Sequence, residues 1–249
     1  MSKFIDRTGE KSITNQGYEV EIIEYFNNVN CTIKFNTSKK TILKNQKYKC
    51  IKSGNIKNPY HPLFNGVGYI GEGKFNATSY KKINIFYNTW RNMISRCYSK
   101  KGQEKQPSYI GCLVDEEWHN FQNFAEWFED NYVEGWHLDK DILIKGNKIY
   151  SPETCCFVPL EINSLFTKSD KIRGEYPIGV SKKDKKYQAN VNKNSGFIFL
   201  GAFNTPEEAF QVYKTAKEDY IKEVADKWRG QITEQVYQAM YSYQVEITD

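Results

Sequence analysis

The sequence predicts an α+β protein built from several small units. Its 249 residues are many for one domain, since domains usually run to about 100–150 residues. Strand-like alternation appears in the first fifty residues and again near the C-terminus, and stretches of helical spacing lie between them. Because 39% of the residues are hydrophobic and 15% aromatic, the chain can build real cores. We expect a small β-rich unit of unknown role over 1–76, a central unit over 80–168 and a third unit over 174–249.

The N-terminal segment has the pattern of a β-hairpin. Residues 17–36, GYEVEIIEYFNNVNCTIKFN, alternate apolar and polar side chains around an asparagine-rich turn. The stretch KYKCIKSG at 47–54 predicts another strand. Residues 58–74, NPYHPLFNGVGYIGEGK, are too rich in glycine and proline to form the interior of a helix. The β-rich unit therefore ends near residues 74–80.

Two helices are predicted in the central unit. The first covers about 83–98, with an apolar face of Phe86, Trp90, Met93, Ile94 and Cys97. The second lies within 116–132, with an aromatic stripe of Trp118, Phe121, Phe124, Ala125 and Phe128. Such a stripe is typical of a core. Residues 115–134 hold seven carboxylates and no lysine or arginine, which we interpret as the solvated face of this helix.

Residues 135–163 predict a strand, a long loop, a short strand and a helix. The strand is expected over 136–143, and the loop turns at Lys145-Gly146-Asn147. Ser151-Pro152-Glu153 has the pattern of a short helix start, because serine caps a helix and proline suits its first position. A further helix from Pro159 to about Thr167 would carry Asn163 back toward the strand.

The C-terminal unit is predicted to be three short strands followed by a helix. Thr205-Pro206-Glu207-Glu208 has a capping residue, a first-position proline and early carboxylates, so the helix should begin there and run to about Trp228. Alternation along 186–192 puts Tyr187, Ala189 and Val191 on one face and Gln188, Asn190 and Asn192 on the other. The first face is expected to pack on the helix.

The charge of the chain is unevenly distributed. The formal net charge is +5, but residues 168–193 alone hold eight basic residues against three acidic ones. Lysines there could hold phosphates, and the amides of the second strand could hydrogen-bond to base edges. The alternative is an ordinary solvated sheet face.

Neither a membrane-spanning segment nor a structural zinc site is predicted. No apolar run approaches the roughly 20 residues that cross a bilayer, and the first ten residues lack the apolar core of a signal peptide, so we expect a soluble, cytoplasmic protein. The six cysteines are expected to be buried thiols. Cys97, Cys112 and Cys155 with His119 or His137 would be the donors of a structural zinc site, but without a Cys-x-x-Cys pair we do not expect one.

Two segments resemble known families. Residues 87–163 resemble the HNH-type (His-Me finger, ββα-metal) endonucleases found in phage genomes, on Trp90, Arg96-Cys97, Tyr109, Cys112, Glu117-Trp118, Phe121, Phe124, Leu138-Asp139-Lys140, Ser151-Pro152-Glu153 and Cys155. Residues 176–220 resemble the small DNA-binding domain that plant apetala/ethylene-response factors share with phage integrases and homing endonucleases. Together the resemblances cover about two thirds of the chain and leave the N-terminal third unassigned. If the protein is phage-encoded, its compartment is the host-cell cytoplasm.

The first resemblance implies a magnesium- or manganese-dependent site. Asp139 matches the metal-binding aspartate and Asn163 the ligand on the helix, and both offer the hard oxygen donors that such cations prefer. Lys140 stands at the position of the general-base histidine and Thr154 at that of the middle asparagine, so two of four positions depart from the pattern. Lys140 is a poor base and would instead contact phosphate.

The base in such a site would have to come from elsewhere. His137 lies two residues before Asp139, on the same face of a regular strand, and is the first candidate, with Tyr150 the weaker one. Structural alternatives stay open. His137 could be a packed, hydrogen-bonded side chain, Asp139 and Asp141 could pair with nearby lysines, and Asn163 could cap or brace its helix.

The second resemblance implies a three-stranded sheet in the major groove of double-stranded DNA. The candidate DNA-binding residues are Arg173, Lys182, Lys183, Lys185, Lys186, Gln188, Asn190, Asn192 and Lys193.

Three functions are consistent with these patterns. The first is a phage-type, metal-dependent DNA endonuclease of homing or free-standing HNH character. The second is a catalytically inactive DNA-binding or regulatory protein with the same fold, which Lys140 and Thr154 favour. The third is an inhibitor of a host system that binds a host protein through the N-terminal unit or the acidic 115–134 face. None of them involves a membrane, and the sequence carries no signal of a particular oligomeric state.

Overall fold

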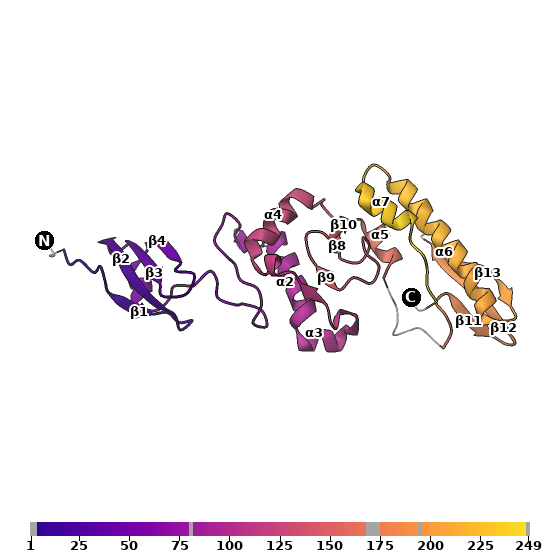
Figure 1. Ribbon diagram of the computed structural model, residues 1–249, viewed down its shortest axis with the longest axis horizontal. Helices are drawn as coiled ribbons and strands as arrows, with labels where there is room; N and C mark the ends of the chain where they lie inside the picture. Colours follow the sequence, from indigo (N-terminus) through magenta and orange to yellow (C-terminus); the bar gives the residue numbers. More distant parts are fainter. Residues whose placement is uncertain (1–3, 80–81, 168–174, 194–195, 248–249) are drawn as a thin grey trace. The chain divides into compact units, whose positions relative to one another are not determined.

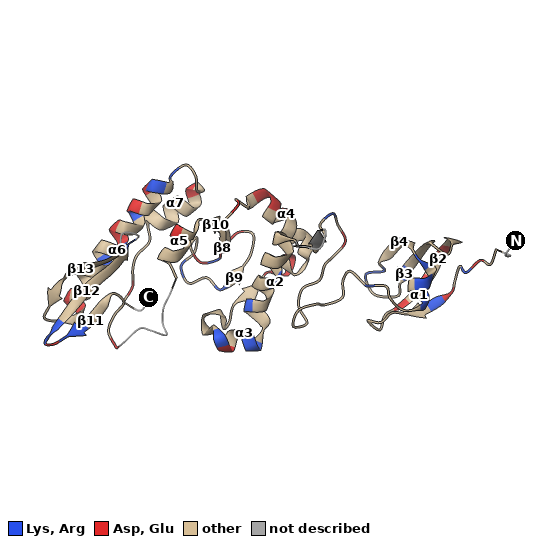
Figure 2. Ribbon diagram, turned by 180° about the vertical axis from the view of Figure 1, so that it is seen from behind, with Lys and Arg blue, Asp and Glu red and all other residues tan. Residues whose placement is uncertain are grey.

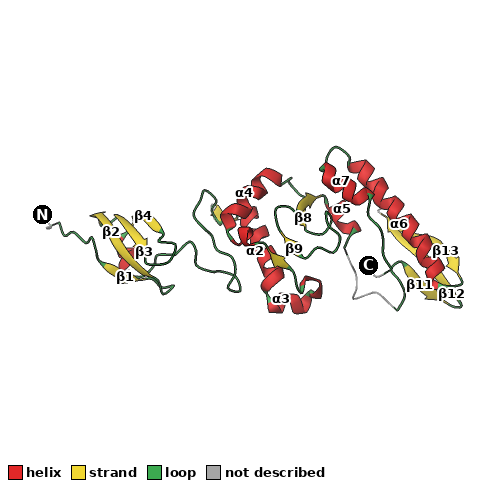
Figure 3. Ribbon diagram, in the orientation of Figure 1, coloured by secondary structure: helices red, strands yellow, loops and turns green. Residues whose placement is uncertain are grey.

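The computed structural model describes residues 4–79, 82–167, 175–193 and 196–247 (Figure 1). Helices and several small sheets occur together, so the predicted α+β class is confirmed (Figure 3). The chain divides into two compact units, Met1–Pro107 with Glu116–Glu126, and Ser108–Asp115 with Trp127–Asp249. No helix in the described part of the chain combines the length and apolarity needed to span a bilayer.

The first unit begins with an antiparallel sheet in the order β1-β2-β3-β4. Its strands are β1 (Lys11–Ile13), β2 (Glu19–Asn27), β3 (Asn30–Phe35) and β4 (Ile42–Gln46). The predicted hairpin is confirmed, since β2 and β3 pair around the asparagine-rich turn. Its inward face carries Val20, Ile22, Cys31, Ile33 and Phe35, which pack with Ile51 and Ile56.

The strand predicted at 47–54 is wrong, because α1 (Tyr48–Lys52) is a single helical turn. Helical spacing places Tyr48 and Lys52 on one side of this turn, where both contact Glu10. The Tyr48 hydroxyl donates to Glu10 at 3.0 Å, and the Lys52 ammonium pairs with the same carboxylate at 3.0 Å. Ile51 is buried in the sheet core on the other side.

The remaining elements of the first unit confirm the predicted helices. They are β5 (Thr78–Ser79), β6 (Lys82–Ile83), α2 (Ile85–Tyr98), α3 (Lys100–Lys105), the short η2 (Glu116–His119) and the beginning of α4 (Phe121–Asn131). Trp90, Met93, Ile94 and Cys97 of α2 are buried, and so is the whole aromatic stripe from Trp118 to Phe128. The Trp90 indole N–H donates to the carbonyl of Trp118 at 2.7 Å, which joins the two helical segments.

The second unit contains a small ββα arrangement. After η1 (Pro107–Tyr109) and β7 (Leu113–Val114), the chain forms β8 (His137–Asp139), β9 (Ile149–Tyr150), β10 (Cys156–Val158) and α5 (Leu160–Leu165). β8 pairs with β10 antiparallel, and β7 pairs with β9 parallel. The helix predicted from Pro159 is confirmed, whereas the predicted strand over 136–143 ends at Asp139.

The helix start predicted at Ser151-Pro152-Glu153 is only a turn. Ser151 caps it, since its hydroxyl accepts from the Thr154 N–H at 3.3 Å and its carbonyl accepts from the Cys155 N–H at 3.0 Å. The chain then enters β10, because Cys156, Phe157 and Val158 are all buried and suit a strand better than a helix.

The predicted C-terminal architecture is confirmed. β11 (Val180–Lys183), β12 (Lys186–Lys193) and β13 (Gly196–Phe203) form an antiparallel sheet on α6 (Pro206–Trp228), and α7 (Glu234–Tyr241) follows. Thr205 and Glu208 form a reciprocal capping box at the start of α6. Gly179 precedes the sheet with a positive φ and lies so close to the Tyr213 ring that a Cβ would overlap it.

Helix α6 takes part in two separate cores. Ala209, Phe210 and Tyr213 pack against Ala189 and Val191 of β12. Further along the helix, Tyr220, Ile221, Val224 and Ala225 pack with residues of the ββα arrangement and of α7, including Ile142, Cys156, Val158 and Ile162. The predicted boundary at 168–174 therefore lies in the chain between two segments that share one core.

Candidate functional sites

The ββα arrangement brings the predicted metal residues onto neighbouring elements. Asp139 ends β8, where it faces Cys156 of β10, and Asn163 lies on α5, which contacts β8. His137 lies two residues before Asp139 and is exposed. Residues two apart on a strand point to the same face, so the exposed imidazole and the carboxylate share one side of β8.

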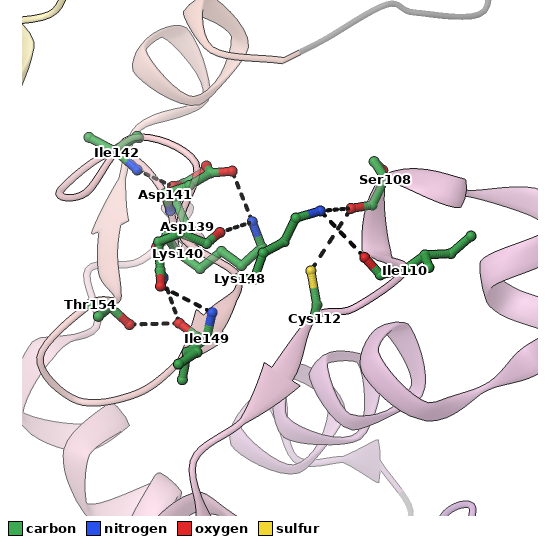
Figure 4. A network of polar contacts seen from close by, with 11 residues as sticks. Ser108, Ile110, Cys112, Asp139, Lys140, Asp141, Ile142, Lys148, Ile149 and Thr154 are labelled. Carbon is green, nitrogen blue, oxygen red and sulfur yellow. Dashed lines mark hydrogen bonds and ion pairs between the residues drawn. The ribbon is translucent and has the colours of Figure 1, made fainter.

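Asp139 is half-buried and is held by backbone hydrogen bonds. Its Oδ1 accepts the N–H groups of Asp141 at 2.8 Å and Ile142 at 2.9 Å (Figure 4). Burial, together with the nearby Asp141 carboxylate, raises the pKa of Asp139 to about 6, although the two N–H groups act in the opposite direction. At neutral pH this carboxylate is mostly charged, and the Lys140 ammonium lies beside the neighbouring Asp141.

Lys140 is engaged within the protein. Its side chain is buried, with 9% of the residue exposed. Its ammonium lies 2.8 Å from Asp141 Oδ2 and 3.1 Å from the Asn147 carbonyl. Burial lowers the pKa of Lys140, but the hydrogen bond and charge of Asp141 outweigh it, and the net pKa is raised. Lys140 is therefore a cation at neutral pH, and a contact with phosphate would have to replace these two partners.

Asn147 organises the loop between β8 and β9, a role that the sequence did not reveal. Its amide donates to the carbonyls of Lys140 at 2.6 Å and Ile149 at 2.7 Å. Thr154 closes the other end, since its hydroxyl donates to the Ile149 carbonyl at 2.7 Å (Figure 4). The Gly146-Asn147 pair indicated a turn, but nothing in it specified which carbonyls the amide would reach. Thr154, which stands where the HNH pattern has its middle asparagine, thus stabilises the loop between β8 and β10.

The cysteines do not join these residues in a donor cluster. Burial strongly raises the pKa of Cys155 and raises the pKa of Cys156 to about 12, so both are neutral thiols. The six cysteines form no disulfide within the described part of the chain. Within the described ranges, no three side chains among His, Cys, Asp and Glu are grouped to hold a metal. Asp139 and Asn163 supply oxygen donors of the kind that Mg²⁺ or Mn²⁺ binds.

The C-terminal sheet has one covered face and one open face. Residues directly opposite each other in an antiparallel sheet share a face, so the register assigns each side chain. The face toward α6 carries Tyr187, Ala189 and Val191, as predicted, with Val180 of β11. The other face, called here the open face, consists of Ser181, Lys183, Lys186, Gln188, Asn190, Asn192, Phe197, Phe199 and Ala202.

The candidate lysines are distributed between the two faces and the turn. Lys183 and Lys186 pair across β11 and β12 on the open face, and Lys185 lies in the tight turn between them. Figure 2 shows basic residues gathered at this β11–β12 end of the sheet. Lys182 shares the side of Tyr187 and lies over that ring at 5.7 Å. Lys193 pairs with Glu223 of α6 at 2.8 Å, which places it on the helix side. Arg173 lies outside the described residues.

Two phenylalanines of β13 belong to the open face, and the sequence did not single them out. Phe197 is 74% exposed and Phe199 is 56% exposed. The run Phe197-Ile198-Phe199-Leu200 is apolar on both faces, which was the available signal, because a strand covered on one side normally alternates with polar residues. A bulge between Ala189 and Asn190 sets their register.

Comparison with known proteins adds no relative: no family model matches this chain, and neither the curated proteins nor the solved structures contain a match.

Proposed function

We propose that this chain is a double-stranded DNA-binding protein whose open face of β11–β13 contacts the duplex. The observation that carries the proposal is the construction of this sheet. One face is covered by α6, and the other carries amide side chains and exposed phenylalanines. A lysine-rich turn adjoins this second face. Amide side chains pair with base edges, and lysines hold the phosphates that flank them.

The charge of the β11–β12 turn supports a polyanionic partner. Lys182, Lys183, Lys185 and Lys186 lie within five positions of one another, with Asp184 as the only acidic residue among them. All four lysines are exposed. A protein that neutralises phosphates releases condensed counterions, so its affinity falls as a power of the salt concentration.

The test is the salt dependence of duplex binding. Replacing Lys182, Lys183, Lys185 and Lys186 by glutamine should reduce the slope of log K against log salt by up to about 3–4, since each phosphate contact contributes about 0.9. A matched control replaces four exposed lysines of the first unit, Lys40, Lys44, Lys47 and Lys49. An equal change of slope in both variants would place the contact elsewhere. Absence of duplex binding at moderate salt would remove the proposal and favour a protein partner.

A second candidate function is metal-dependent hydrolysis of phosphodiester bonds in that duplex. The observation that favours it is the ββα arrangement, which places Asp139 and Asn163 on neighbouring elements beside the exposed His137. A bound Mg²⁺ or Mn²⁺ would stabilise the charge that develops on the phosphate and the leaving oxygen. Asp139 and Asn163 would hold that cation, and His137 would take the proton from the attacking water. Lys140 would continue to fix the loop through Asp141 and Asn147.

Cleavage is tested on supercoiled DNA that carries the genomic neighbourhood of the gene, with magnesium, with manganese and with chelator. We expect nicked or linear product only with metal, and loss of it in both Asp139→Ala and Asn163→Ala. Asp219→Ala is the control, because this aspartate is exposed on α6. Full activity in either site variant would exclude that residue as a ligand. Intact duplex binding without any product would leave the DNA-binding function alone.

A further inference from the structure

The open face pairs an amide with an apolar group three times in succession. In the register of β12 and β13, Gln188 faces Ala202, Asn190 faces Phe199 and Asn192 faces Phe197. Side chains at directly opposed positions lie about 4.5–5.5 Å apart at Cβ. Each pair therefore offers hydrogen-bonding atoms and an apolar surface to the same small area of a partner.

Four of these six groups are exposed, whereas Gln188 and Asn190 are half-buried and the Asn190 amide donates to the Ser181 hydroxyl at 3.5 Å. Phe197 and Phe199 are mostly exposed, and Asn192 and Ala202 are exposed as well. The α6 helix covers the opposite face, where Ala189 and Val191 are buried. Large apolar side chains gathered on one exposed face indicate a binding surface. The adjoining lysine turn makes a polyanion the partner that matches in charge.

An A·T base pair displays the complementary pattern in the major groove. Adenine presents N7 and N6–H₂, which one asparagine or glutamine amide can bind together, and thymine presents its C5-methyl group, which suits an apolar contact. Guanine is read mainly by arginine or lysine. On the open face the lysines stand at the β11–β12 end, whereas amides and apolar groups occupy the length of β12 and β13.

We infer that the open face of β11–β13 selects duplex sites rich in A·T pairs, with its amides on adenine and Phe197 and Phe199 on thymine methyl groups. This inference rests on the DNA-binding function proposed above and specifies its target class. Asn190 with Phe199 forms the centre of the reading surface. Lys183, Lys185 and Lys186 contact the phosphates at one end.

The experiment begins with the full-length protein and a random-sequence duplex library. Selection should enrich A·T pairs over a few adjacent positions. Uracil then replaces thymine in the selected duplex, which removes the methyl groups and leaves the hydrogen-bonding pattern intact. Binding should weaken about fourfold for each contacted methyl, since one buried carbon contributes about 0.8 kcal/mol. Asn190→Ala should weaken binding to the selected duplex about tenfold, and its effect on unselected duplex should be smaller, because the contact with adenine is lost only where adenine is present.

The decisive experiment is a double-mutant cycle that combines a substitution in the protein with the replacement of thymine by uracil in the DNA. Phe199→Ala should weaken binding to the thymine duplex. Replacing thymine by uracil should then weaken binding of this variant much less than binding of the wild type, because the protein change and the DNA change remove the same contact. The control is Phe26→Ala, which truncates an exposed phenylalanine of β2 in the first unit and should retain the full uracil effect. Thermal unfolding checks that each variant folds.

Three results would overturn the inference. Enrichment of G·C pairs, an affinity unaffected by uracil, or an equal uracil effect in the wild type and Phe199→Ala would each show that the open face does not read thymine. If the protein bound duplex without any base preference, this inference would fail and the proposed function would stand. If no duplex bound and Phe197→Ala or Phe199→Ala abolished self-association, the open face would be a protein interface, and both would fail.

Discussion

Asp139 destabilises the folded protein at neutral pH. Its pKa in the fold is about 6, above the ordinary value of 3.8, because the carboxyl is buried and Asp141 is close. A raised carboxyl pKa gives a stabilising contribution that is full below about pH 4, where the unfolded chain is also protonated. This contribution is lost as the pH rises through 6. Proteins often retain such a cost where function needs it.

We therefore predict that Asp139→Asn stabilises the protein at pH 7. The neutral amide can still accept the N–H groups of Asp141 and Ile142, and it removes the charge. In chelator, the free energy of unfolding by urea should rise on the order of 1–2 kcal/mol at pH 7 and change little at pH 4. Asp141→Asn is the comparison variant. It removes the carboxylate partner of Lys140, which lowers stability, and also the like charge beside Asp139, which raises it, so its net effect should be smaller than that of Asp139→Asn. A gain that is the same at both pH values would contradict this account.

Other residues show how far the sequence could lead. Alternation correctly assigned Tyr187, Ala189 and Val191 to the covered face, because one buried face forces a period of two. The pairing of Lys140 with Asp141 agrees with the alternative in which Asp141 pairs with a nearby lysine. Asn147 was not predictable as a partner, since it reaches Lys140 only through the folded loop. Lys193 was predicted as a DNA contact on charge alone, and its ion pair with Glu223 depends on where α6 lies.

At the scale of elements, local signals succeeded where they agreed with the burial pattern. Thr205, Pro206 and Glu208 predicted the start of α6, and the capping box forms there. Ser151-Pro152-Glu153 carried a similar signal, but the following residues are apolar and buried, so burial in β10 overrode the cap. The prediction of a strand over 47–54 was wrong for a different reason. The helical turn found there is five residues long, which is too short for periodicity to distinguish a strand from a helix.

The capping box leads to a prediction for α6. Thr205→Ala should lower the free energy of unfolding by about 1 kcal/mol, because the Glu208 N–H loses its hydroxyl acceptor. Thr215→Ala serves as the control. Its hydroxyl only donates back to the Gln211 carbonyl within the same helix, and alanine is the better helix former there. Urea unfolding followed by circular dichroism measures both changes. Equal losses in the two variants would show that the cap has no special role.

At the scale of the whole molecule, α6 ties the ββα arrangement to the C-terminal sheet. Ile221 is fully buried in the core shared with Val158 and Ile162, and Ala209 belongs to the core beneath β12. The second unit is therefore one body in packing terms, although the sequence suggests two. The resemblances to two families favoured a boundary at 168–174, because sequence patterns report segments and not the cores that the segments share.

Ile221→Ala should destabilise both the ββα arrangement and the C-terminal sheet. We predict a loss of about 2–5 kcal/mol, typical of a truncated buried side chain. Hydrogen exchange should show lower protection in both β10 and β12, while β2 and β3 of the first unit remain protected. Ile33→Ala, in the core of the N-terminal sheet, should give the reverse pattern. Loss of protection in β10 without loss in β12 would show that the two cores unfold independently.

The α6 helix also fixes the spacing between its two cores. Tyr213, in the core beneath the sheet, and Val224, in the core beside β8, are eleven residues apart on one uninterrupted helix. At about 1.5 Å per residue, these two positions lie about 16 Å apart along the helix axis. Because one helix takes part in both cores, the ββα arrangement and the C-terminal sheet would keep the same relation to each other on a bound duplex. If the second candidate function holds, a strand break made beside Asp139 would fall at a constant offset from the sequence that the sheet contacts.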